Sequence, residues 1–271
     1  MLFSIHKMFT KKGGLMKSII LFFFATCSLC ADIYEVDSIK EMDKYKEEGV
    51  LFLYDIDNTL ITLKQTLGTD QWFYYRFGQL KKVLGDDAKA LERALSEWTS
   101  IQYISEIAEV EKGSSEIIKN QQNEGVCCIG FTTRGLTLSH CTLSQLNSIG
   151  IDFSKSAPSK EDLFFQTTQN IIFRHGVLFT SGTNKGKALA GFLSRIEFKP
   201  KKIVFINDKH THLADVEKGC EELGIPFIGL RYNYLDAVVE GFNPKIADIQ
   251  GKRLFTLLSD EEAQAMIKKD F

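Results

Sequence analysis

The sequence has little proline and no repetition. Only four of its 271 residues are proline, and no low-complexity tract or internal repeat is visible. Hydrophobic residues make up 44% of the chain and charged residues 25%, which is the ordinary balance of a globular protein. The length allows one sizeable domain or two small ones.

The sequence also lacks a basic excess. Its formal net charge is −2, and the first 31 residues hold four of the 33 basic residues and none of the 35 acidic ones. Residues 32–271 therefore carry 29 basic side chains against 35 acidic ones. A chain with this acidic balance does not favour nucleic acid as a partner.

Cysteines with metal-binding spacing are absent from residues 32–271. Four of the six cysteines lie there, and none belongs to a C-x-x-C motif. Cys127 and Cys128 lie within an apolar run, which is typical of small core residues. Neighbours on a strand point to opposite faces, so we expect these two thiols not to pair with each other.

The beginning of the chain has the pattern of an export signal. A lysine-rich start is followed by the apolar run IILFFFATCSLCA (residues 19–31), which ends in small residues. This order predicts a secretory signal peptide over residues 1–31 and an exported protein, periplasmic or secreted. A lipoprotein anchored through Cys27 or Cys30 and a buried N-terminal strand or helix are the alternatives. The run is too short for an ordinary membrane span, so we expect no stable span after cleavage.

Apolar runs alternate with helical patterns along residues 32–271. The predicted strands are the runs at residues 50–55, 126–131, 202–208 and 225–232, together with a hairpin at 170–182 that turns at His175-Gly176. The predicted helices are a short one from the capping box at Ser38–Glu41 to near Gly49, two within 69–112, and those at 115–123, 137–148, 184–195 and 212–224. This alternation predicts an α/β fold, a Rossmann-like open parallel sheet with helices on both faces.

Chemistry-bearing side chains follow three of the predicted strands. Asp55 and Asp57 come at the end of the first apolar run, Thr132 follows the second, and Asp208 ends the run KIVFIND. In an open parallel sheet the ligand binds beyond the carboxyl ends of the strands. We therefore expect these four side chains to lie close together at one edge.

These segments resemble, in order, the four motifs of the haloacid dehalogenase-like superfamily, in its phosphatase branch. Asp55-Ile56-Asp57-Asn58-Thr59 is similar to the D-x-D-x-T first motif, and GFTTRG, NKGKAL and IVFIND resemble the second, third and fourth. The leader, the helical insert and the hairpin also resemble a little-characterised secreted bacterial family within this superfamily. The resemblance implies one such domain over residues 32–271, with a small helical cap inserted at about 64–114.

The resemblance implies a phosphatase that hydrolyses small phosphomonoesters through an aspartyl-phosphate. Asp55 would be the nucleophile, and Asp57 would act as general acid to the leaving group and then as base for water. A hard cation such as Mg²⁺ would offset the charge of the carboxylates and the phosphate. Its ligands would be Asp55, Asp57 through its backbone carbonyl, and Asp208.

Three further residues would contact the phosphate. Thr132 would bond a phosphoryl oxygen, with Thr133 as the competitor and a helix N-cap as the structural alternative. Lys185 would neutralise the phosphate and restrain Asp55, with Lys187 as the rival and a solvated helix face as the alternative for either lysine. Arg134 would contact the substrate phosphate or support the site from behind, or it would pair with a surface acid.

The fourth motif departs from the superfamily pattern. Many relatives carry two acids there, whereas this chain has Asn207 before Asp208 and His212 four residues later, with Asp215 farther along. Asn207 carries no charge and histidine is a poor partner for Mg²⁺, so the departure predicts weak metal binding through Asp208. Two other functions stay open: a protein that binds a phosphorylated ligand or another protein without turnover, and a phosphotransferase.

Overall fold

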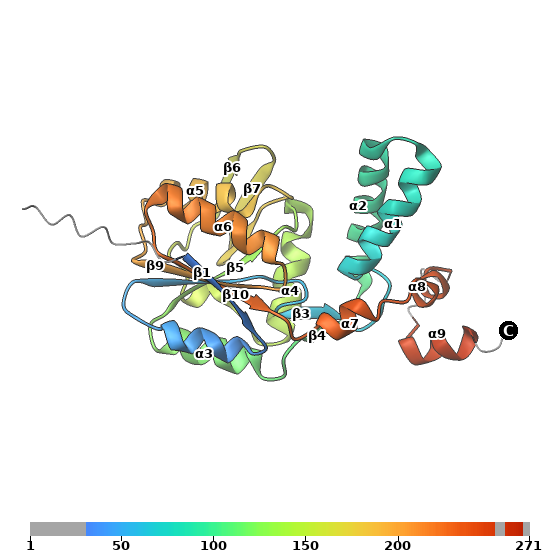
Figure 1. Ribbon diagram of the computed structural model, residues 1–271, viewed down its shortest axis with the longest axis horizontal. Helices are drawn as coiled ribbons and strands as arrows, with labels where there is room; N and C mark the ends of the chain where they lie inside the picture. Colours follow the sequence, from blue (N-terminus) through green and yellow to red (C-terminus); the bar gives the residue numbers. More distant parts are fainter. Residues whose placement is uncertain (1–30, 253–257, 268–271) are drawn as a thin grey trace, which may run out of the picture.

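A mixed eight-stranded sheet forms the centre of the structure, a computed structural model that describes residues 31–252 and 258–267 (Figure 1). The predicted signal peptide lies outside the described residues, except for its last one. The strands are β1 (Ala31–Val36), β2 (Val50–Tyr54), β3 (Ile61–Leu63), β4 (Ile107–Glu109), β5 (Cys127–Thr132), β6 (Leu163–Gln166), β7 (Asn170–Arg174), β8 (Val177–Phe179), β9 (Lys202–Asn207) and β10 (Phe227–Tyr232). The large sheet has the order β1-β10-β9-β2-β5-β8-β7-β6.

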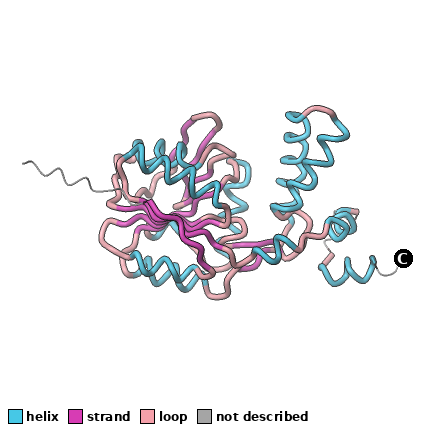
Figure 2. The backbone as a smooth tube through the Cα atoms, viewed as in Figure 1, coloured by secondary structure: helices cyan, strands magenta, loops and turns pink. Residues whose placement is uncertain are grey.

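Helices cover both faces of this sheet, as the tube in Figure 2 shows. The α-helices are α1 (Asp70–Leu84), α2 (Asp87–Ile104), α3 (Ser114–Asn123), α4 (Ser139–Ser148), α5 (Lys185–Arg195), α6 (His210–Leu223), α7 (Asp236–Glu240), α8 (Pro244–Gly251) and α9 (Asp260–Ile267). Short 3-10 helices are η1 (Ile39–Tyr45), η2 (Leu136–Leu138) and η3 (Phe153–Lys155). The first six strands of the sheet order run parallel, while β7 and β6 are antiparallel. The predicted fold class, an α/β Rossmann-like sheet, is therefore confirmed.

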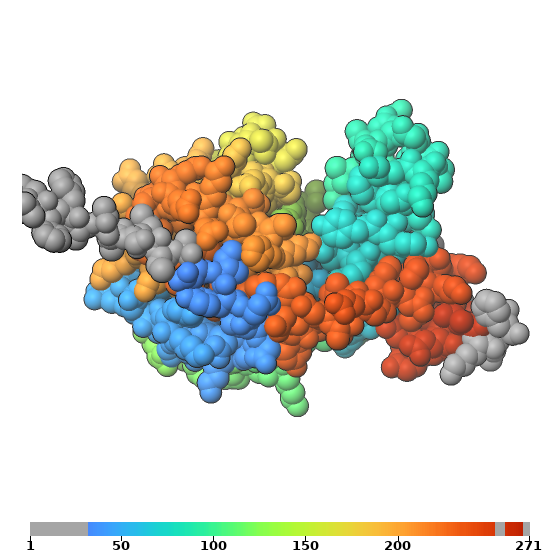
Figure 3. All heavy atoms as spheres, in the orientation of Figure 1, coloured from blue at the N-terminus to red at the C-terminus, as the bar shows by residue number. Residues whose placement is uncertain are grey.

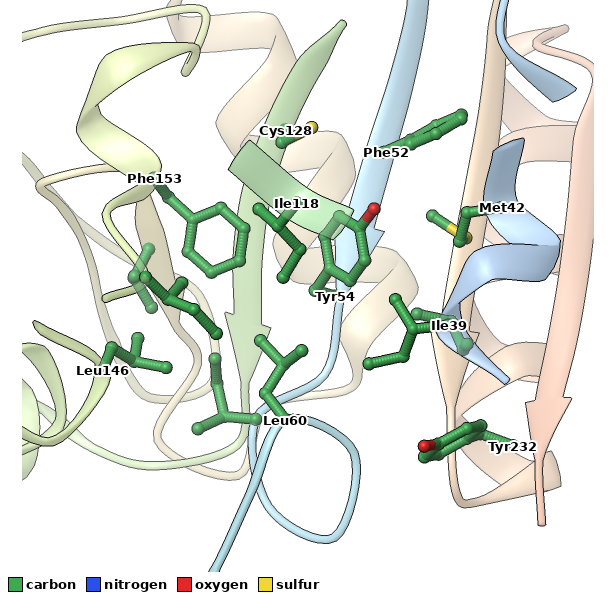
Figure 4. Close-up of a cluster of buried hydrophobic side chains, with 14 of the residues drawn as sticks. Ile39, Met42, Phe52, Tyr54, Leu60, Ile118, Cys128, Leu146, Phe153 and Tyr232 are labelled. Carbon is green, nitrogen blue, oxygen red and sulfur yellow. The ribbon is translucent and has the colours of Figure 1, made fainter. Parts of the chain in front are cut away.

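The central strand β2 is buried on both faces because its side chains alternate. Phe52 and Tyr54 lie in one cluster with Ile118 of α3 and Leu146 of α4, as Figure 4 shows. Leu51 and Leu53 lie in the other cluster, with side chains of α5 and α6. A strand between two helical layers must be apolar at every position, which is why VLFLY has no polar alternation.

The two neighbouring cysteines follow the same rule. Cys128 is buried in the cluster of α3 and α4, and Cys127 packs against the cluster of α5 and α6. Both are free thiols, as predicted.

The predicted hairpin is also confirmed: β7 and β8 join at His175 and Gly176, which have φ angles of 47° and 77°. A Cβ at Gly176 would lie 2.4 Å from the carbonyl carbon of Phe153, so only glycine fits there.

The capping box predicted at Ser38–Glu41 is right in its serine and wrong in its acid. Ser38 caps η1 by accepting a bond from the Lys40 N–H, but the acid that contacts the cap is Glu111. Its carboxylate accepts bonds from the Ser38 hydroxyl and the Ile39 N–H, both at 2.7 Å. Glu111 lies in the loop after β4, 73 positions from Ser38, and no local pattern in the sequence predicts a contact between them.

The helical prediction for residues 69–112 is right for α1 and α2 and wrong after Ile104. Residues 107–109 form β4, which pairs antiparallel with β3. Leu91 and Leu95 are four positions apart, which is the spacing of a buried stripe on a helix, but they are 41% and 44% exposed. The hairpin buries Ala90 and Ala94 with Leu80 instead. Small side chains let α1 and α2 approach closely, and Leu91 and Leu95 then lie on the side of α2 that faces solvent.

The α1–α2 hairpin projects from one side of the sheet (Figures 1 and 3). Gly85, with φ of 63°, ends α1, and the Asp86 side chain caps the first turn of α2. The small β3–β4 sheet forms its base, and α8 and α9, which the sequence patterns did not reveal, lie beside it (Figure 1). In the part of the chain that the structure describes, no helix combines the length and apolar character of a membrane span.

Candidate active site at the carboxyl ends of the strands

Three neighbouring parallel strands end at the candidate site. Because β2 lies between β9 and β5, the residues at and just after the ends of these strands meet at one edge: Asp208, Asp55 and Thr132. The Asp55 N–H donates to the Ile206 carbonyl at 3.1 Å, which extends the β2–β9 ladder to the carboxylate itself. The sheet therefore fixes the backbone of Asp55 before any side-chain contact is made.

Asp55 forms a buried ion pair with Lys185. The Lys185 Nζ lies 2.5 Å from Asp55 Oδ1 and donates to the Phe131 carbonyl at 2.9 Å. The side chains are 1% and 8% exposed for Lys185 and Asp55. Burial raises the pKa of Asp55 against the opposing charge of Lys185, and burial likewise lowers the pKa of Lys185 against the charge of Asp55. Lys187, the alternative lysine, is exposed.

The position of Lys185 depends on how α5 packs against α6. Asn184 caps α5 by accepting a bond from the Lys187 N–H at 3.1 Å. The next residue but one, Gly186, lies directly against α6: a Cβ there would come 2.0 Å from the Asp215 carbonyl oxygen. The two helices can meet this closely because Gly186 faces Gly219. This close packing holds the first turn of α5, and with it Lys185, at the edge of the sheet.

Asp57 is held by a buried arginine. Arg134 Nη2 lies 2.7 Å from Asp57 Oδ1, and Arg134 Nε lies 2.9 Å from Oδ2. The arginine side chain is 1% exposed and the aspartate side chain 30% exposed. Of the roles that the sequence leaves open for Arg134, the geometry favours support of the site over direct contact with a substrate. A two-point contact of this kind fixes both the position and the plane of the carboxylate.

Thr132 and Thr133 differ in burial. Thr132 is 1% exposed, and its hydroxyl oxygen accepts a bond from the Arg134 N–H at 3.1 Å. Its own O–H can still donate to a ligand, since a hydroxyl is donor and acceptor at once. Thr133 is exposed. The structure thus brings Thr132 to the edge shared with Asp55 and leaves Thr133 on the surface.

Asp208 lies in a setting that suits a cation. Burial first, and then the nearby charge of Asp55, raise the pKa of Asp208 to about 8. Asn58 approaches it with a long contact, 3.4 Å from Nδ2 to Oδ2. The carboxylates of Asp55 and Asp208 and the backbone carbonyl of Asp57 offer only oxygen, which fits Mg²⁺. Among the described residues, no three His, Cys, Asp or Glu side chains gather as metal ligands, so water or substrate oxygens would complete the shell.

Asn207 and His212 do not add to this oxygen set. Asn207 is fully buried, and its Oδ1 accepts a bond from the Lys209 N–H at 2.7 Å, which places the side chain at the turn. Its Nδ2 lies 3.4 Å from His212 Nδ1. Burial, followed by the charges of Lys185 and Lys209, lowers the pKa of His212 to about 3. His212 is therefore uncharged and turned toward an amide.

Two sets of contacts to the α1–α2 hairpin were not predicted from the sequence. Lys209 lies 2.5 Å from Asp70 and 3.3 Å from the hydroxyl of Tyr74, both on α1. Burial alone would lower the pKa of Lys209, but the charge and the hydrogen bond of Asp70 outweigh it and raise that pKa. Gln102 of α2 contacts Arg134. The only local signal for Lys209 is its place directly after Asp208, and Gln102 has none.

The fold and this edge define an α/β, Rossmann-like protein with a candidate active site at the carboxyl ends of the strands. Residues 32–264 match the model of the family described as "Protein of unknown function (DUF2608)", and the chain belongs to this family. It is 26% identical over 258 residues to a "Putative outer membrane protein" of Chlamydia pneumoniae, covering 90% of this chain and 93% of the relative. It is 24% identical to an uncharacterized protein of Rickettsia prowazekii, covering 91% and 94%.

Solved structures that are similar to this chain include hydrolases of the haloacid dehalogenase (HAD) superfamily. A HAD-superfamily hydrolase from Geobacter sulfurreducens gives a TM-score of 0.40 at 11% identity, covering 71% of this chain and 96% of that one. A phospho-aspartyl intermediate analogue of phosphoserine phosphatase gives 0.35 at 14% identity, covering 73% and 100%. At these TM-scores and identities the similarity carries no argument about activity.

The close packing at Gly186 predicts a specific sensitivity. We expect Gly186→Ala to lower the free energy of unfolding by about 1–3 kcal/mol, because the added methyl group must push α5 away from the Asp215 carbonyl. The matched control is Gly78→Ala in α1, where an added Cβ meets nothing within 4 Å. That change should raise stability by about 0.5–1 kcal/mol through helix propensity. Urea unfolding followed by circular dichroism measures both, and equal stability of Gly186→Ala and the wild type would contradict the packing argument.

Proposed function

We propose that the protein is a Mg²⁺-dependent phosphatase that hydrolyses small phosphomonoesters through an aspartyl-phosphate. The observation that carries this proposal is the buried Asp55–Lys185 pair at the carboxyl end of β2. The second carboxylate, two residues further, is held by Arg134 at the same edge. These contacts support a nucleophile in Asp55, a proton-transfer group in Asp57 and a positive charge in Lys185 at one edge of the sheet.

Asp55 attacks through the oxygen that Lys185 leaves free. Lys185 contacts Oδ1, so Oδ2 forms the bond to phosphorus while the bond from phosphorus to the ester oxygen breaks. The leaving oxygen takes the electron pair of that bond and a proton from Asp57, and the alcohol departs. Lys185 and the Thr132 hydroxyl stabilise the charge on the phosphoryl oxygens.

The second step returns the enzyme to its starting state. Asp57 takes a proton from water, the water oxygen bonds to phosphorus, and the bond from phosphorus to Asp55 breaks to give inorganic phosphate. Mg²⁺ bound by Asp55, Asp208 and the Asp57 carbonyl would supply the positive charge that lets carboxylates and phosphate approach.

Arg134 holds the Asp57 carboxylate by both of its oxygens, so it fixes the point from which a proton goes to the leaving group and to which one returns from water. A substrate with a good leaving group depends less on that first proton, so an aryl phosphate is the appropriate first substrate.

A second candidate function is binding of a phosphorylated ligand without turnover. Asn207 in place of an acid favours this function, since its side chain serves the turn and adds no charge near Asp208. Transfer of the phosphoryl group from Asp55 to an alcohol instead of water is a third. Turnover of an aryl phosphate separates the first two, and an added alcohol acceptor separates hydrolysis from transfer.

We also infer that the protein is exported to the cell envelope, as a periplasmic or secreted enzyme. The lysine-rich, then apolar start of the chain supports this, as do the names of the chlamydial relatives, which are called putative outer membrane proteins. Mass spectrometry of the exported protein should show a new N-terminus near Ala31 or Asp32. A lipid-modified Cys27 or Cys30 would favour the lipoprotein alternative, and full-length protein confined to the cytoplasm would contradict export.

Replacing the nucleophile should abolish turnover and keep the fold. We expect Asp55→Asn to hydrolyse an aryl phosphate at less than about one thousandth of the wild-type rate in Mg²⁺, because an amide cannot form the aspartyl-phosphate. The control is Asp87→Asn at the tip of the hairpin, where the side chain is 71% exposed, and it should retain full activity. Near wild-type hydrolysis by Asp55→Asn would remove Asp55 from the mechanism.

The metal dependence of activity should run through Asp208. We expect Asp208→Asn to raise the Mg²⁺ concentration for half-maximal activity on the order of a hundredfold, because one charged oxygen ligand is lost. Asp215→Asn is the control, since Asp215 lies in α6 beyond the turn, and it should keep the wild-type dependence. Unchanged Mg²⁺ dependence in Asp208→Asn would refute this ligand assignment.

A further inference from the structure

Gln102 is a buried polar residue that ties the hairpin to the site. It lies near the end of α2 and is 1% exposed. Its Oε1 accepts a bond from Arg134 Nη2 at 3.1 Å, and its Nε2 donates to the Gly68 carbonyl at 2.8 Å. Gly68 lies just before α1, so one side chain joins both ends of the hairpin to Arg134.

Arg134 uses all five of its N–H donors in this arrangement. The Nε and one Nη2 proton go to Asp57, and the other Nη2 proton goes to Gln102. The two Nη1 protons go to Thr142 at 3.0 Å and Gln145 at 2.7 Å. A guanidinium is planar with fixed donor directions, so these partners together determine its orientation. Loss of Gln102 leaves one buried Nη2 proton without its acceptor.

Gln102 also reaches Arg134 by a second route. Its backbone carbonyl accepts a bond from Gln145 Nε2 at 3.3 Å, and Gln145 Oε1 in turn accepts from Arg134. The ring of Trp98, one turn earlier in α2, lies 5.7 Å from the guanidinium carbon. Thus α2 supplies an amide acceptor, an aromatic ring and a backbone contact around one arginine that the sheet alone does not hold.

We propose that Gln102 is a positioning residue for Asp57 and acts through Arg134. This inference rests on the proposed function, because it assigns Gln102 to the orientation of the proton-transfer carboxylate. Asp57 is 30% exposed, and Arg134 fixes both of its oxygens. Arg134 is in turn oriented by a residue of the inserted hairpin, so the end of α2 is a fixed part of the active site.

The kinetic test compares two buried glutamines. Gln102→Met keeps the length and volume of the side chain and removes both of its strong hydrogen-bonding groups. We expect kcat to fall roughly tenfold while KM stays within about twofold, because Asp57 moves protons and does not bind the phosphate. Gln121→Met is the matched control: Gln121 is also 1% exposed and bonds Tyr54 and Asp43, away from Arg134. It should be destabilised similarly and keep the wild-type kcat.

A spectroscopic test is independent of turnover. In protein with ¹⁵N-labelled arginine, the side-chain N–H signals of Arg134 should shift and exchange faster with water in Gln102→Met, and should be unchanged in Gln121→Met. If Gln102→Met does not fold, Gln102→Asn withdraws the acceptor by one carbon and should give the same changes.

The two tests separate the two ideas. If the wild type hydrolyses no phosphomonoester, the proposed function fails, and the arginine signals still decide whether Gln102 orients Arg134. If Gln102→Met or Gln102→Asn keeps both the wild-type kcat and the wild-type Arg134 signals, the inference is overturned. It is equally overturned if Gln121→Met loses as much kcat as Gln102→Met.

Discussion

The buried ion pair between Asp55 and Lys185 is the contact on which the arrangement of the site depends. Two charges removed from water are costly, and losing one partner of such a pair typically costs about 3–5 kcal/mol. Apolar side chains of similar size would serve the packing of the fold as well. The charges are nevertheless kept between Phe131 and Phe205, whose rings lie about 5 Å from the lysine nitrogen. The buried pair is therefore better explained by the proposed function than by the stability of the fold.

The other acids near Asp55 have different neighbours. Asp57 is paired with Arg134 and Asp70 with Lys209, whereas the Asp208 carboxylate accepts a long hydrogen bond from the Asn58 amide. Of these three carboxylates, that of Asp208 would therefore gain most from the positive charge of an added cation. The hairpin takes part on both sides of this site, since α1 contacts Lys209 beside Asp208 and α2 contacts Arg134 beside Asp57.

The sequence predicted the strands of the sheet and the helices α1 and α2 well, but it predicted the shorter elements and the buried face of α2 poorly. Short apolar runs bounded by turn residues favour strands buried on both faces, and β2, β5, β9 and β10 lie within two residues of their predicted bounds. The edge strands β1 and β6, the β3–β4 ribbon and α7 to α9 did not stand out, because they are short or depend on distant partners. In α2, close packing against α1 buries Ala90 and Ala94 and leaves the leucines exposed.

The sequence by itself determined the order of the candidate groups and their meeting at one edge. Asp55, Thr132 and Asp208 end or follow apolar strands, and parallel strands bring such residues together. The resemblance predicted that Lys185 restrains Asp55, but only the tertiary structure decided the other partners: Arg134 against Asp57, and Gln102 against Arg134. The physical reason is distance along the chain. A strand is specified by the residues within it, whereas a contact between side chains 32 or 77 positions apart leaves no local pattern.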